Sequence, residues 1–243
     1  MSGDLIDTTE MYLKTVFELH ETGTAPMRAR IAERLGHSGP TVSQTVARME
    51  RDGLLHLDEN RRIQLTDAGR ELATDVMRRH RLAERHLLDV IGLDYALVHE
   101  EACRWEHVMS REVERRIAER ITPPYVDPYG NPIPGLRELG VTLAGGEEQV
   151  TPEGQERAKA IADLGDVVAD GARAEVLIER IGEVLQSDPG QLGELADHGI
   201  VPGAVADVDR VADSFVLRGP AGGEIGVPLA VAGQLRVTVI SHG

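Results

Sequence analysis

Two histidines, the only cysteine and the only tryptophan of the chain fall within the nine residues His-Glu-Glu-Ala-Cys-Arg-Trp-Glu-His, numbered 99–107. Apolar residues recur on both sides of this stretch at intervals typical of a helix. At 100° per residue, one face of that helix would carry four side chains: His99, Cys103, Glu106 and His107. Imidazole, thiolate and carboxylate groups on one stripe can bind a transition metal. The alternative is a buried thiol beside two solvated histidines, because a free cysteine is commonly a small core residue.

The composition indicates a folded, soluble protein rather than a membrane protein. Its 243 residues are 41% hydrophobic, enough for one large domain or a few small ones. No apolar run approaches the roughly 18 residues of a membrane span, and the N-terminus lacks the cationic and apolar segments of a secretion signal. Because a single cysteine allows no disulfide framework, we expect a cytoplasmic location.

The net charge of −15 is unevenly distributed and does not exclude nucleic acid as a partner. Residues 145–243 hold 7 Lys and Arg against 17 Asp and Glu, whereas residues 27–51 hold five Arg against two Glu. Phosphate contacts act within about one Debye length, roughly 10 Å at 0.1 M salt. The local basic segment can therefore bind DNA although the whole chain is acidic.

The order of elements near the N-terminus predicts a winged helix-turn-helix. Helical patterns cover residues 4–20, 25–35 and 41–52, and a tight turn at 36–39 joins the second helix to the third. Pro40 lies in the first turn of the third helix, where proline is favoured. A helix, a short glycine-containing turn and a second helix form the helix-turn-helix arrangement.

The third helix and the segment after it have the polar surface that DNA binding requires. Its outer face carries hydroxyl, amide and guanidinium groups, on Thr41, Ser43, Gln44, Thr45, Arg48 and Arg51. Apolar strands at 54–57 and 63–65 surround a charged tip and predict a β-ribbon, the wing. This order favours a DNA-binding domain. The alternative is a structural helix-hairpin unit with a solvated polar face.

Helices are predicted over residues 68–91 and from before 99 to about 121, and His80 and Glu84 lie one turn apart in the first of them. Residues 76–121 have more apolar surface than one small module needs, so we expect a dimer interface there. The alternative is that this surface packs onto the winged helix. Five prolines within residues 122–137 predict an ordered, irregular loop.

The C-terminal part changes to strand-like patterns. Residues 145–171 are acidic and rich in small residues, which predicts a linker with a possible helix over 156–164. Short apolar strands separated by glycine-containing turns then indicate a small β-barrel without a catalytic signature of its own. The predicted fold class is mainly α with β. The predicted domains are DNA-binding (1–75), helical dimerisation and metal-binding (76–144), linker (145–171) and β-barrel (172–243).

Several motifs add a specific family resemblance. They are Asp-Thr-Thr-Glu-Met-Tyr-Leu at 7–13, Arg-Ala-Arg-Ile-Ala-Glu-Arg-Leu at 28–35, the run at 38–54, His-Arg-Leu-Ala-Glu at 80–84, Glu-Ala-Cys-Arg-Trp-Glu-His-Val-Met at 101–109 and Gly-Asn-Pro-Ile-Pro-Gly-Leu at 130–136. Residues 4–140 thereby closely resemble the diphtheria-toxin-repressor family of iron-dependent transcriptional regulators. The C-terminal third is loosely similar to the SH3-like domain of that family.

The resemblance implies two metal sites per chain. The primary, activating site corresponds to Met11, Cys103, Glu106 and His107. The ancillary site corresponds to His80, Glu84 and His99, completed by a Glu and a Gln of the SH3-like domain, for which Glu183 and Gln186 match best. Taken alone, His80 and Glu84 could form a surface salt bridge, and Met11 could simply fill the core. The mixed, borderline-soft donor set favours Fe(II) over Mn(II), although Co, Ni and Zn also suit it.

The resemblance also implies how the chain contacts operator DNA. Ser38, Pro40 and Gln44 are expected at base edges. The residues expected to contact phosphates are Thr8, Arg28, Ala29, Thr41, Ser43, Arg48 and Arg51. In the family, the first turn of the N-terminal helix rearranges on activation so that it no longer obstructs the DNA.

The sequence therefore predicts a DNA-binding repressor of iron-uptake genes, activated by two Fe(II) ions per chain and by dimerisation, with two dimers on an operator as in the family. We expect no enzymatic activity, and Co, Ni, Mn or Zn could replace iron. The alternatives are a manganese-responsive regulator of the same family and a metal-independent winged-helix regulator. A metal-dependent hydrolase is disfavoured because the chain has no HExxH-type frame and the helix-turn-helix would be unexplained.

Overall fold

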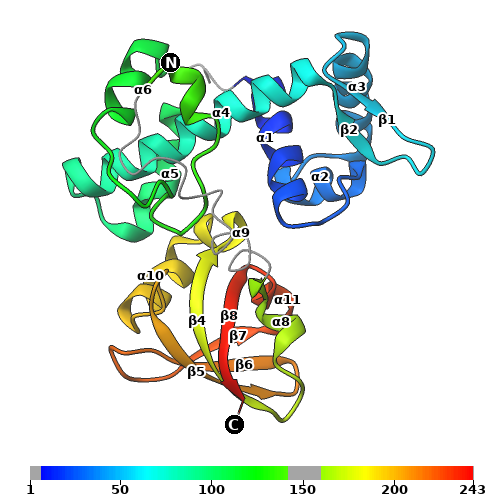
Figure 1. The fold of residues 1–243 in the computed structure, drawn as a ribbon. Helices are drawn as coiled ribbons and strands as arrows, with labels where there is room; N and C mark the ends of the chain where they lie inside the picture. Colours follow the sequence, from blue (N-terminus) through cyan, green and yellow to red (C-terminus); the bar gives the residue numbers. More distant parts are fainter. Residues whose placement is uncertain (1–6, 142–159, 243) are drawn as a thin grey trace.

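A computed structural model of the chain describes residues 7–141 and 160–242. A helical part, with the winged helix at one end, lies above an antiparallel β domain (Figure 1). Residues 7–65 form α1 (Thr8–Glu21), α2 (Arg28–Leu35), α3 (Gly39–Arg51), β1 (Leu55–Leu57) and β2 (Ile63–Leu65). The two strands pair antiparallel, with Leu55 opposite Leu65. The predicted winged helix-turn-helix is confirmed.

Local capping explains where the helices of this unit begin. The Asp7 carboxylate accepts hydrogen bonds from the first backbone N–H groups of α1, and the Ser38 hydroxyl accepts one from Thr41 N. Because Ser38 is the cap, α3 begins at Gly39, two residues earlier than predicted. Gly36 ends α2 with a φ of 64°, a conformation that glycine adopts without strain.

The middle of the chain forms a helical hairpin around one long helix. Its elements are α4 (Asp67–His86), a π-helical turn (Leu87–Ile91), a 3-10 turn (Tyr95–Leu97), α5 (Val98–Trp105), α6 (Arg111–Ala118) and a second 3-10 turn (Leu136–Leu139). The single helix predicted through residues 99–121 is wrong. Helix α5 ends at Trp105, and Ser110 starts α6 by accepting a hydrogen bond from Val113 N. Consequently Glu106 and His107 lie in the connection that follows α5.

The β domain is a single curved sheet with the strand order β3-β8-β4-β5-β6-β7. Its elements are β3 (Ala162–Asp163), α8 (Leu164–Val167), β4 (Arg173–Ile181), α9 (Glu183–Gln186), α10 (Pro189–Asp197), β5 (Val205–Val211), β6 (Ser214–Arg218), β7 (Ile225–Pro228), α11 (Leu229–Ala232) and β8 (Leu235–His242). The strands predicted after residue 172 are confirmed. The sheet nevertheless begins at Ala162, inside the predicted linker, because β3 pairs with β8. Residues 142–159, the rest of that linker and part of its possible helix, lie outside the described residues.

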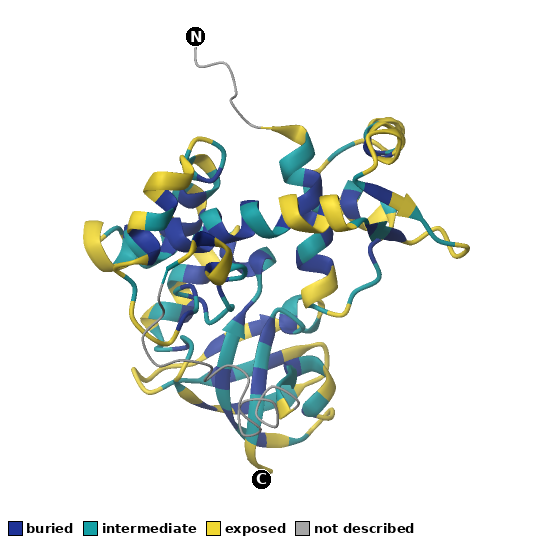
Figure 2. Ribbon diagram, turned by 45° about the horizontal axis from the view of Figure 1, so that its top comes forward, coloured by how far each residue is buried: buried dark blue, intermediate teal, exposed yellow. Residues whose placement is uncertain are grey.

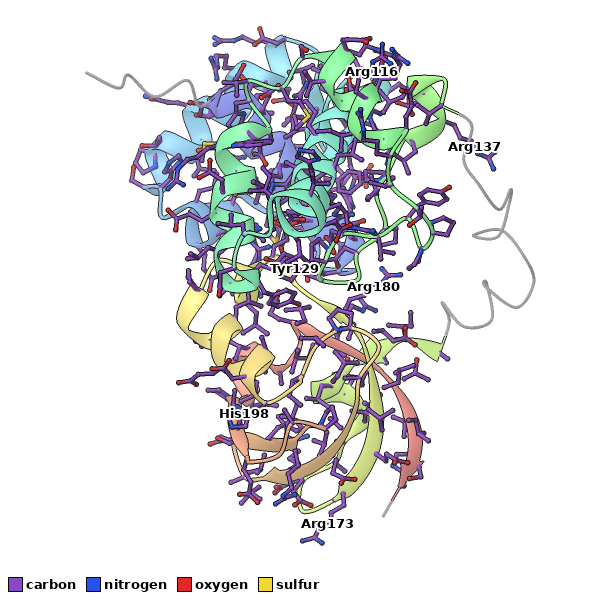
Figure 3. The ribbon with its side chains drawn as sticks, turned by 90° about the vertical axis from the view of Figure 1, so that its left-hand side faces the viewer. Arg116, Tyr129, Arg137, Arg173, Arg180 and His198 are labelled. Atoms are coloured by element: carbon purple, nitrogen blue, oxygen red, sulfur yellow. The ribbon has the colours of Figure 1, made fainter. Side chains whose placement is uncertain are left out.

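One hydrophobic core joins the helical part to the β domain. It contains Ala102 and Tyr129 from the helical part together with Leu185 and Leu192 from the β domain. The Ile181 N–H also donates a hydrogen bond to the Tyr129 carbonyl at 2.9 Å. Tyr129 lies at this junction in Figure 3, and Figure 2 shows buried residues along the faces that meet there. The shared core therefore holds α9 against the helices.

None of the helices in the described parts of the chain is long and apolar enough to cross a membrane.

Candidate metal centre

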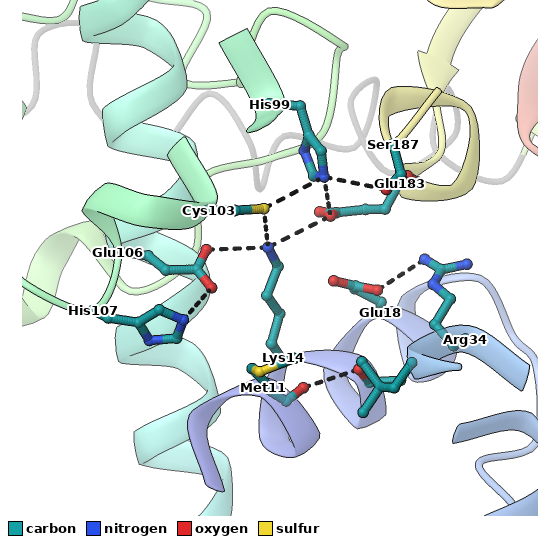
Figure 4. Close-up of a pocket in the computed structure, with 12 residues that line it drawn as sticks. Met11, Lys14, Glu18, Arg34, His99, Cys103, Glu106, His107, Glu183 and Ser187 are labelled. Atoms are coloured by element: carbon teal, nitrogen blue, oxygen red, sulfur yellow. Dashed lines mark hydrogen bonds and ion pairs between the residues drawn. The ribbon is translucent and has the colours of Figure 1, made fainter. Parts of the chain in front are cut away.

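A pocket of about 190 Å³ opens where α1, the α5 region and α9 meet (Figure 4). Its lining is rich in potential metal donors and in charge, with Met11, Lys14, Glu18, Arg34, His99, Cys103, Glu106, His107, Glu183 and Ser187 among its residues. Residues far apart in the sequence thus meet around a single cavity.

Two α4 side chains lie behind the lining of this pocket, in contact with Glu106 and His99. His80 and Glu84 are fully buried, and their Nε2 and Oε1 atoms are 2.8 Å apart. His80 also directs Nδ1 at Glu106 Oε2, at 2.6 Å, and His99 Nδ1 lies 3.1 Å from Glu84 Oε1. The surface salt bridge considered for His80 and Glu84 is therefore wrong. His80, a predicted ancillary ligand, instead contacts Glu106 of the predicted primary set.

Cys103 lies one turn after His99 on α5 and beside both histidines. Its Sγ is 3.6 Å from His99 Nε2, and ligand atoms of His80, His99 and Cys103 lie within 4.8 Å of one another. Burial opposes ionisation of the thiol, but the Lys14 ammonium and hydrogen bonds with the two histidines outweigh burial and lower the pKa of Cys103 to about 5. A thiolate is the form that binds metals, so this thiol is prepared for that role.

Two neighbours of Cys103, the carboxyl of Glu106 and the imidazole of His99, are also shifted toward their charged forms. Burial raises the pKa of Glu106, but Lys14 and His80 more than compensate and bring it to about 2. Burial disfavours the His99 imidazolium, yet hydrogen bonds with Cys103 and Glu84 raise its pKa to about 10. Without metal, the cluster is therefore a network of alternating charges.

His107 and Met11 line the pocket from different elements, the connection after α5 and helix α1. His107 Nδ1 lies 2.6 Å from Glu10 Oε2, and its Nε2 lies 3.4 Å from Glu106 Oε1. The other oxygen of Glu10 is 2.6 Å from Arg79. Met11 is half-buried and lines the pocket from α1, one residue after Glu10. All four predicted primary ligands therefore border the same cavity.

The β domain adds the last two predicted ligands through the short helix α9. Glu183 Oε2 is 3.9 Å from His99 Nε2, and both Glu183 and Gln186 are buried. Gln186 donates from Nε2 to the Ile181 carbonyl at 2.7 Å, whereas its Oε1 is buried without a hydrogen-bond partner among the described residues. Glu84 Oε2 and Glu183 Oε1 are in the same situation. Buried oxygens without a hydrogen-bond donor suit a cation, so these residues fit a metal site.

Three residues of the cluster were missed by the sequence analysis: Glu10, Lys14 and Ser187. The Ser187 hydroxyl lies 3.3 Å from His99 Nε2, and the Lys14 ammonium lies 3.1 Å from Glu106 Oε2. The available signal was helical spacing, because Glu10 and Lys14 are one turn apart on α1 and flank Met11.

The predicted DNA-contacting residues lie on α2, on α3 and its N-cap, and at the first residue of α1. Most are exposed, namely Thr8, Ala29, Ser38, Pro40, Thr41, Gln44, Arg48 and Arg51, while Arg28 and Ser43 are half-buried. Two side-chain hydrogen bonds among the described residues connect α1 to α3 and to the turn before it. Arg48 donates to the Thr9 hydroxyl at 3.3 Å, and the Tyr12 hydroxyl is 3.0 Å from His37 Nδ1 in the turn before α3.

Two family models match the chain. Residues 4–63 match the iron dependent repressor, N-terminal DNA binding domain, and residues 66–135 match the iron dependent repressor, metal binding and dimerisation domain. The iron-dependent repressor IdeR of Mycobacterium tuberculosis is 47% identical over 237 residues, 98% of this chain and 94% of the relative. The chain belongs to the iron-dependent repressor family.

Other repressors are similar to the chain at different levels of sequence identity. The diphtheria toxin repressor of Corynebacterium diphtheriae is 53% identical over 211 residues, covering 85% of this chain and 87% of the relative. Among solved structures, IdeR of T. acidophilum superposes with a TM-score of 0.69 at 26% identity, covering 96% of this chain and 99% of the other. A manganese-dependent transcriptional repressor in complex with manganese gives a TM-score of 0.71 at 25% identity, covering 96% and 100%.

The predicted metal donors come from both matched family domains and from the β domain. Met11 lies in the DNA-binding domain, whereas His80, Glu84, His99, Cys103, Glu106 and His107 lie in the metal-binding and dimerisation domain. Glu183 and Gln186 lie beyond both matches, in the β domain. In this member of the family the cluster thus connects three parts of the chain.

Proposed function

We propose that this chain is an iron(II)-dependent transcriptional repressor of iron-uptake genes, activated when metal binds at the donor cluster. The observation that carries the proposal is the convergence of donor groups at one pocket beside a winged helix. A thioether from α1, a thiolate, imidazoles and carboxylates from the α5 region, and a carboxylate from α9 line or adjoin the pocket, and His80 and Glu84 of α4 lie directly behind them. Such a cluster can link metal binding to the position of the DNA-binding unit.

We assign the residues to two Fe(II) sites as the family pattern implies. Met11, Cys103, Glu106 and His107 would hold the primary ion, and His80, Glu84, His99, Glu183 and Gln186 the ancillary ion. When bound, a divalent cation supplies the positive charge that these anionic and imidazole ligands require. The buried oxygens that lack hydrogen-bond donors, on Glu84, Glu183 and Gln186, support this assignment.

Iron is favoured over manganese by the sulfur ligands. A thiolate and a thioether suit Fe(II), Co(II), Ni(II) or Zn(II) better than Mn(II), which prefers harder oxygen ligands. The family name of the relatives agrees, since the curated relatives of about 50% identity are named iron-dependent or diphtheria toxin repressors. A manganese-responsive regulator remains the second candidate, because a solved structure at 25% identity is a manganese-dependent repressor.

The mechanism follows from the position of α1. Met11 and Tyr12 are adjacent in α1, and Met11 faces the pocket while the Tyr12 hydroxyl contacts His37 before the recognition helix α3. A ligand that favours one placement of α1 therefore favours one placement of α3. By linkage, operator DNA that selects the same placement must raise metal affinity by the same factor.

The exposed polar face of α3 supports DNA reading by the winged helix. We assign Gln44, Ser38 and Pro40 to base edges, since an amide can pair with two atoms of an adenine. Phosphate contacts are assigned to Thr8, Arg28, Ala29, Thr41, Ser43, Arg48 and Arg51. The wing, residues 55–65, would follow the adjacent backbone.

Exposed apolar residues in the turns between α4 and α5, in the connection after α5, and on α6 support a homodimer. Val90, Ile91, Leu97, Val108 and Val113 are all 45% exposed or more. A patch of this kind on a soluble protein marks an interface, and the matched family domain is a dimerisation domain. A dimer would present two α3 helices to a near-palindromic operator, and we propose two dimers per operator. We place the DNA-binding domain at 1–75 and the helical domain at 76–144, and we begin the β domain at Ala162, where its sheet starts.

An anaerobic operator titration tests the proposal. Metal-stripped protein is mixed with a labelled operator duplex and titrated with Fe(II), Co(II), Mn(II) or Zn(II), and binding is followed by fluorescence anisotropy. We expect tight binding with Fe(II) or Co(II), weaker activation by Mn(II), and little binding without metal. Equal affinity with and without metal would refute metal activation.

A further inference from the structure

Lys14 is a charged side chain of the pocket that belongs to neither proposed ligand set. Lys14 Nζ lies 3.1 Å from Glu106 Oε2 and 3.7 Å from Cys103 Sγ, two ligands of the proposed primary site. It also lies 3.1 Å from His80 Nδ1 and 3.8 Å from Glu183 Oε2, two ligands of the proposed ancillary site. The ammonium therefore stands between the two sites and contacts donors of both (Figure 4).

A buried cation at this point has a clear physical role. Lys14 is only 7% exposed, as is Glu183, and Glu106 is 2% exposed. Burying carboxylates without a counter-charge is costly, and a lysine ammonium is a compact charge with three donors. Lys14 thus neutralises the donor cluster when no metal is present.

We propose that Lys14 is an internal competitor of the metal: its ammonium occupies the donor cluster in the metal-free chain, must withdraw when a divalent cation binds, and so sets the metal concentration at which the protein responds. The inference rests on the proposed function. A metal ion bound to Glu106 and Cys103 would lie within a few ångströms of the present position of Nζ, where two like charges repel strongly.

The pocket offers the displaced ammonium another position. Lys14 has a four-carbon stem, and the pocket extends from the cluster along α1 toward Thr15 and Glu18. Glu18 lies one helical turn beyond Lys14, and its Oε2 is 2.8 Å from Arg34. Lys14 can therefore leave the donors while remaining beside a carboxylate, without unfolding α1.

The first test compares Co(II) affinity among charge variants. Lys14→Gln removes the charge but keeps hydrogen-bonding capacity, and Lys14→Arg keeps the charge. Arg34→Gln is the matched control, because it removes one positive charge from the same pocket without touching a proposed ligand. Co(II) is titrated anaerobically into metal-free protein, and binding is followed by the thiolate-to-cobalt absorption band.

We expect Lys14→Gln to bind Co(II) roughly tenfold to a hundredfold more tightly than the wild type. Lys14→Arg and Arg34→Gln should remain within a few-fold of the wild type. In the metal-free state, Lys14→Gln should melt roughly 5–15 °C lower, since its buried carboxylates lose their counter-charge. Opposite effects of one substitution on metal affinity and on metal-free stability distinguish a competitor from a purely structural lysine.

A second test uses the wild type and does not depend on any variant folding. The chain contains only two lysines, Lys14 and Lys159. Amine acetylation with and without Co(II), read by peptide mass spectrometry, gives the labelling rate of Lys14 with Lys159 as internal reference. We expect Co(II) to accelerate labelling of Lys14 severalfold relative to Lys159.

The outcomes separate the inference from the function on which it rests. A wild type that gives no thiolate-to-cobalt band would overturn the proposed metal centre itself. If the wild type binds Co(II) but Lys14→Gln binds no more tightly than Arg34→Gln, the competition is wrong and the metal centre stands. Unchanged Lys14 labelling on Co(II) binding would equally overturn the displacement.

Discussion

The winged-helix surface and the donor cluster are constructed in contrasting ways. The surface is exposed and contiguous in sequence, with its polar side chains on α2 and α3, between Arg28 and Arg51. Most members of the cluster are buried or half-buried, and they come from positions between Glu10 and Ser187. Exposed groups can be changed without affecting the fold, whereas each buried charge in the cluster is also a neighbour's counter-charge. The two regions should therefore respond differently to substitution.

The largest expected effect concerns the cluster. Glu106→Gln removes a buried carboxylate that contacts Lys14, His80 and His107 and is a proposed primary ligand. We expect Fe(II)-dependent operator affinity to fall by about a hundredfold or more, since a charged ligand and its buried pairing are both lost. Fluorescence anisotropy with operator DNA measures it. Glu100→Gln, exposed on α5, is the control and should behave as wild type.

Substitutions on the winged-helix surface should distinguish residues that recognise bases from residues that contribute sequence-independent DNA affinity. Gln44→Ala is expected to reduce discrimination between operator and altered base pairs by about 1–3 kcal/mol. Arg48→Ala should weaken binding to all sequences. The slope of the logarithm of DNA affinity against the logarithm of salt concentration should become shallower by about one. Affinities at several salt concentrations measure both. Identical salt slopes for wild type and Arg48→Ala would show that Arg48 does not contact phosphate.

The winged helix was easier to predict from the sequence than the donor cluster, because the former depends on local signals and the latter on tertiary packing. The winged helix was predictable because helix caps such as Ser38, apolar spacing and the β-ribbon are local signals. In the cluster, Glu106 and His107 were correctly placed near Cys103, but through a continuous helix that does not exist. Their position depends on the end of α5 at Trp105 and on tertiary contacts with His80 and Glu10. Glu183 was found only through a family resemblance.

Lys14 was not predicted because its spacing from two glutamates of α1 fits an exposed helix face as well as a buried one. A lysine one turn from Glu10 and from Glu18 normally indicates a solvated helix face with ion pairs. Here α1 packs against α4, so that face is buried and the ammonium contacts Glu106 instead. Only the packing of the helices reveals that a common surface pattern lies inside a pocket.

A change in ligand type should alter metal preference more than total affinity. Cys103→Asp replaces the thiolate with a hard carboxylate, so we expect the affinity ratio of Mn(II) to Co(II) to rise about tenfold. Competitive titration with a metal-sensitive dye measures this ratio. An unchanged ratio would mean that Cys103 does not select the metal.

The smallest expected effect tests whether the two regions communicate through α1. Tyr12→Phe removes the hydroxyl that lies 3.0 Å from His37 Nδ1 and leaves the buried ring in place. Losing one such hydrogen bond costs about 0.5–1.5 kcal/mol. If the contact connects α1 to the turn before α3, metal affinity should stay constant while the gain in operator affinity on adding metal falls by a few-fold. Tyr95→Phe is a matched control, since its hydroxyl contacts Pro128 far from the winged helix. A Tyr12→Phe protein with the same metal-induced gain as Tyr95→Phe would show that the signal from the donor cluster reaches α3 by another contact, such as the one between Thr9 and Arg48.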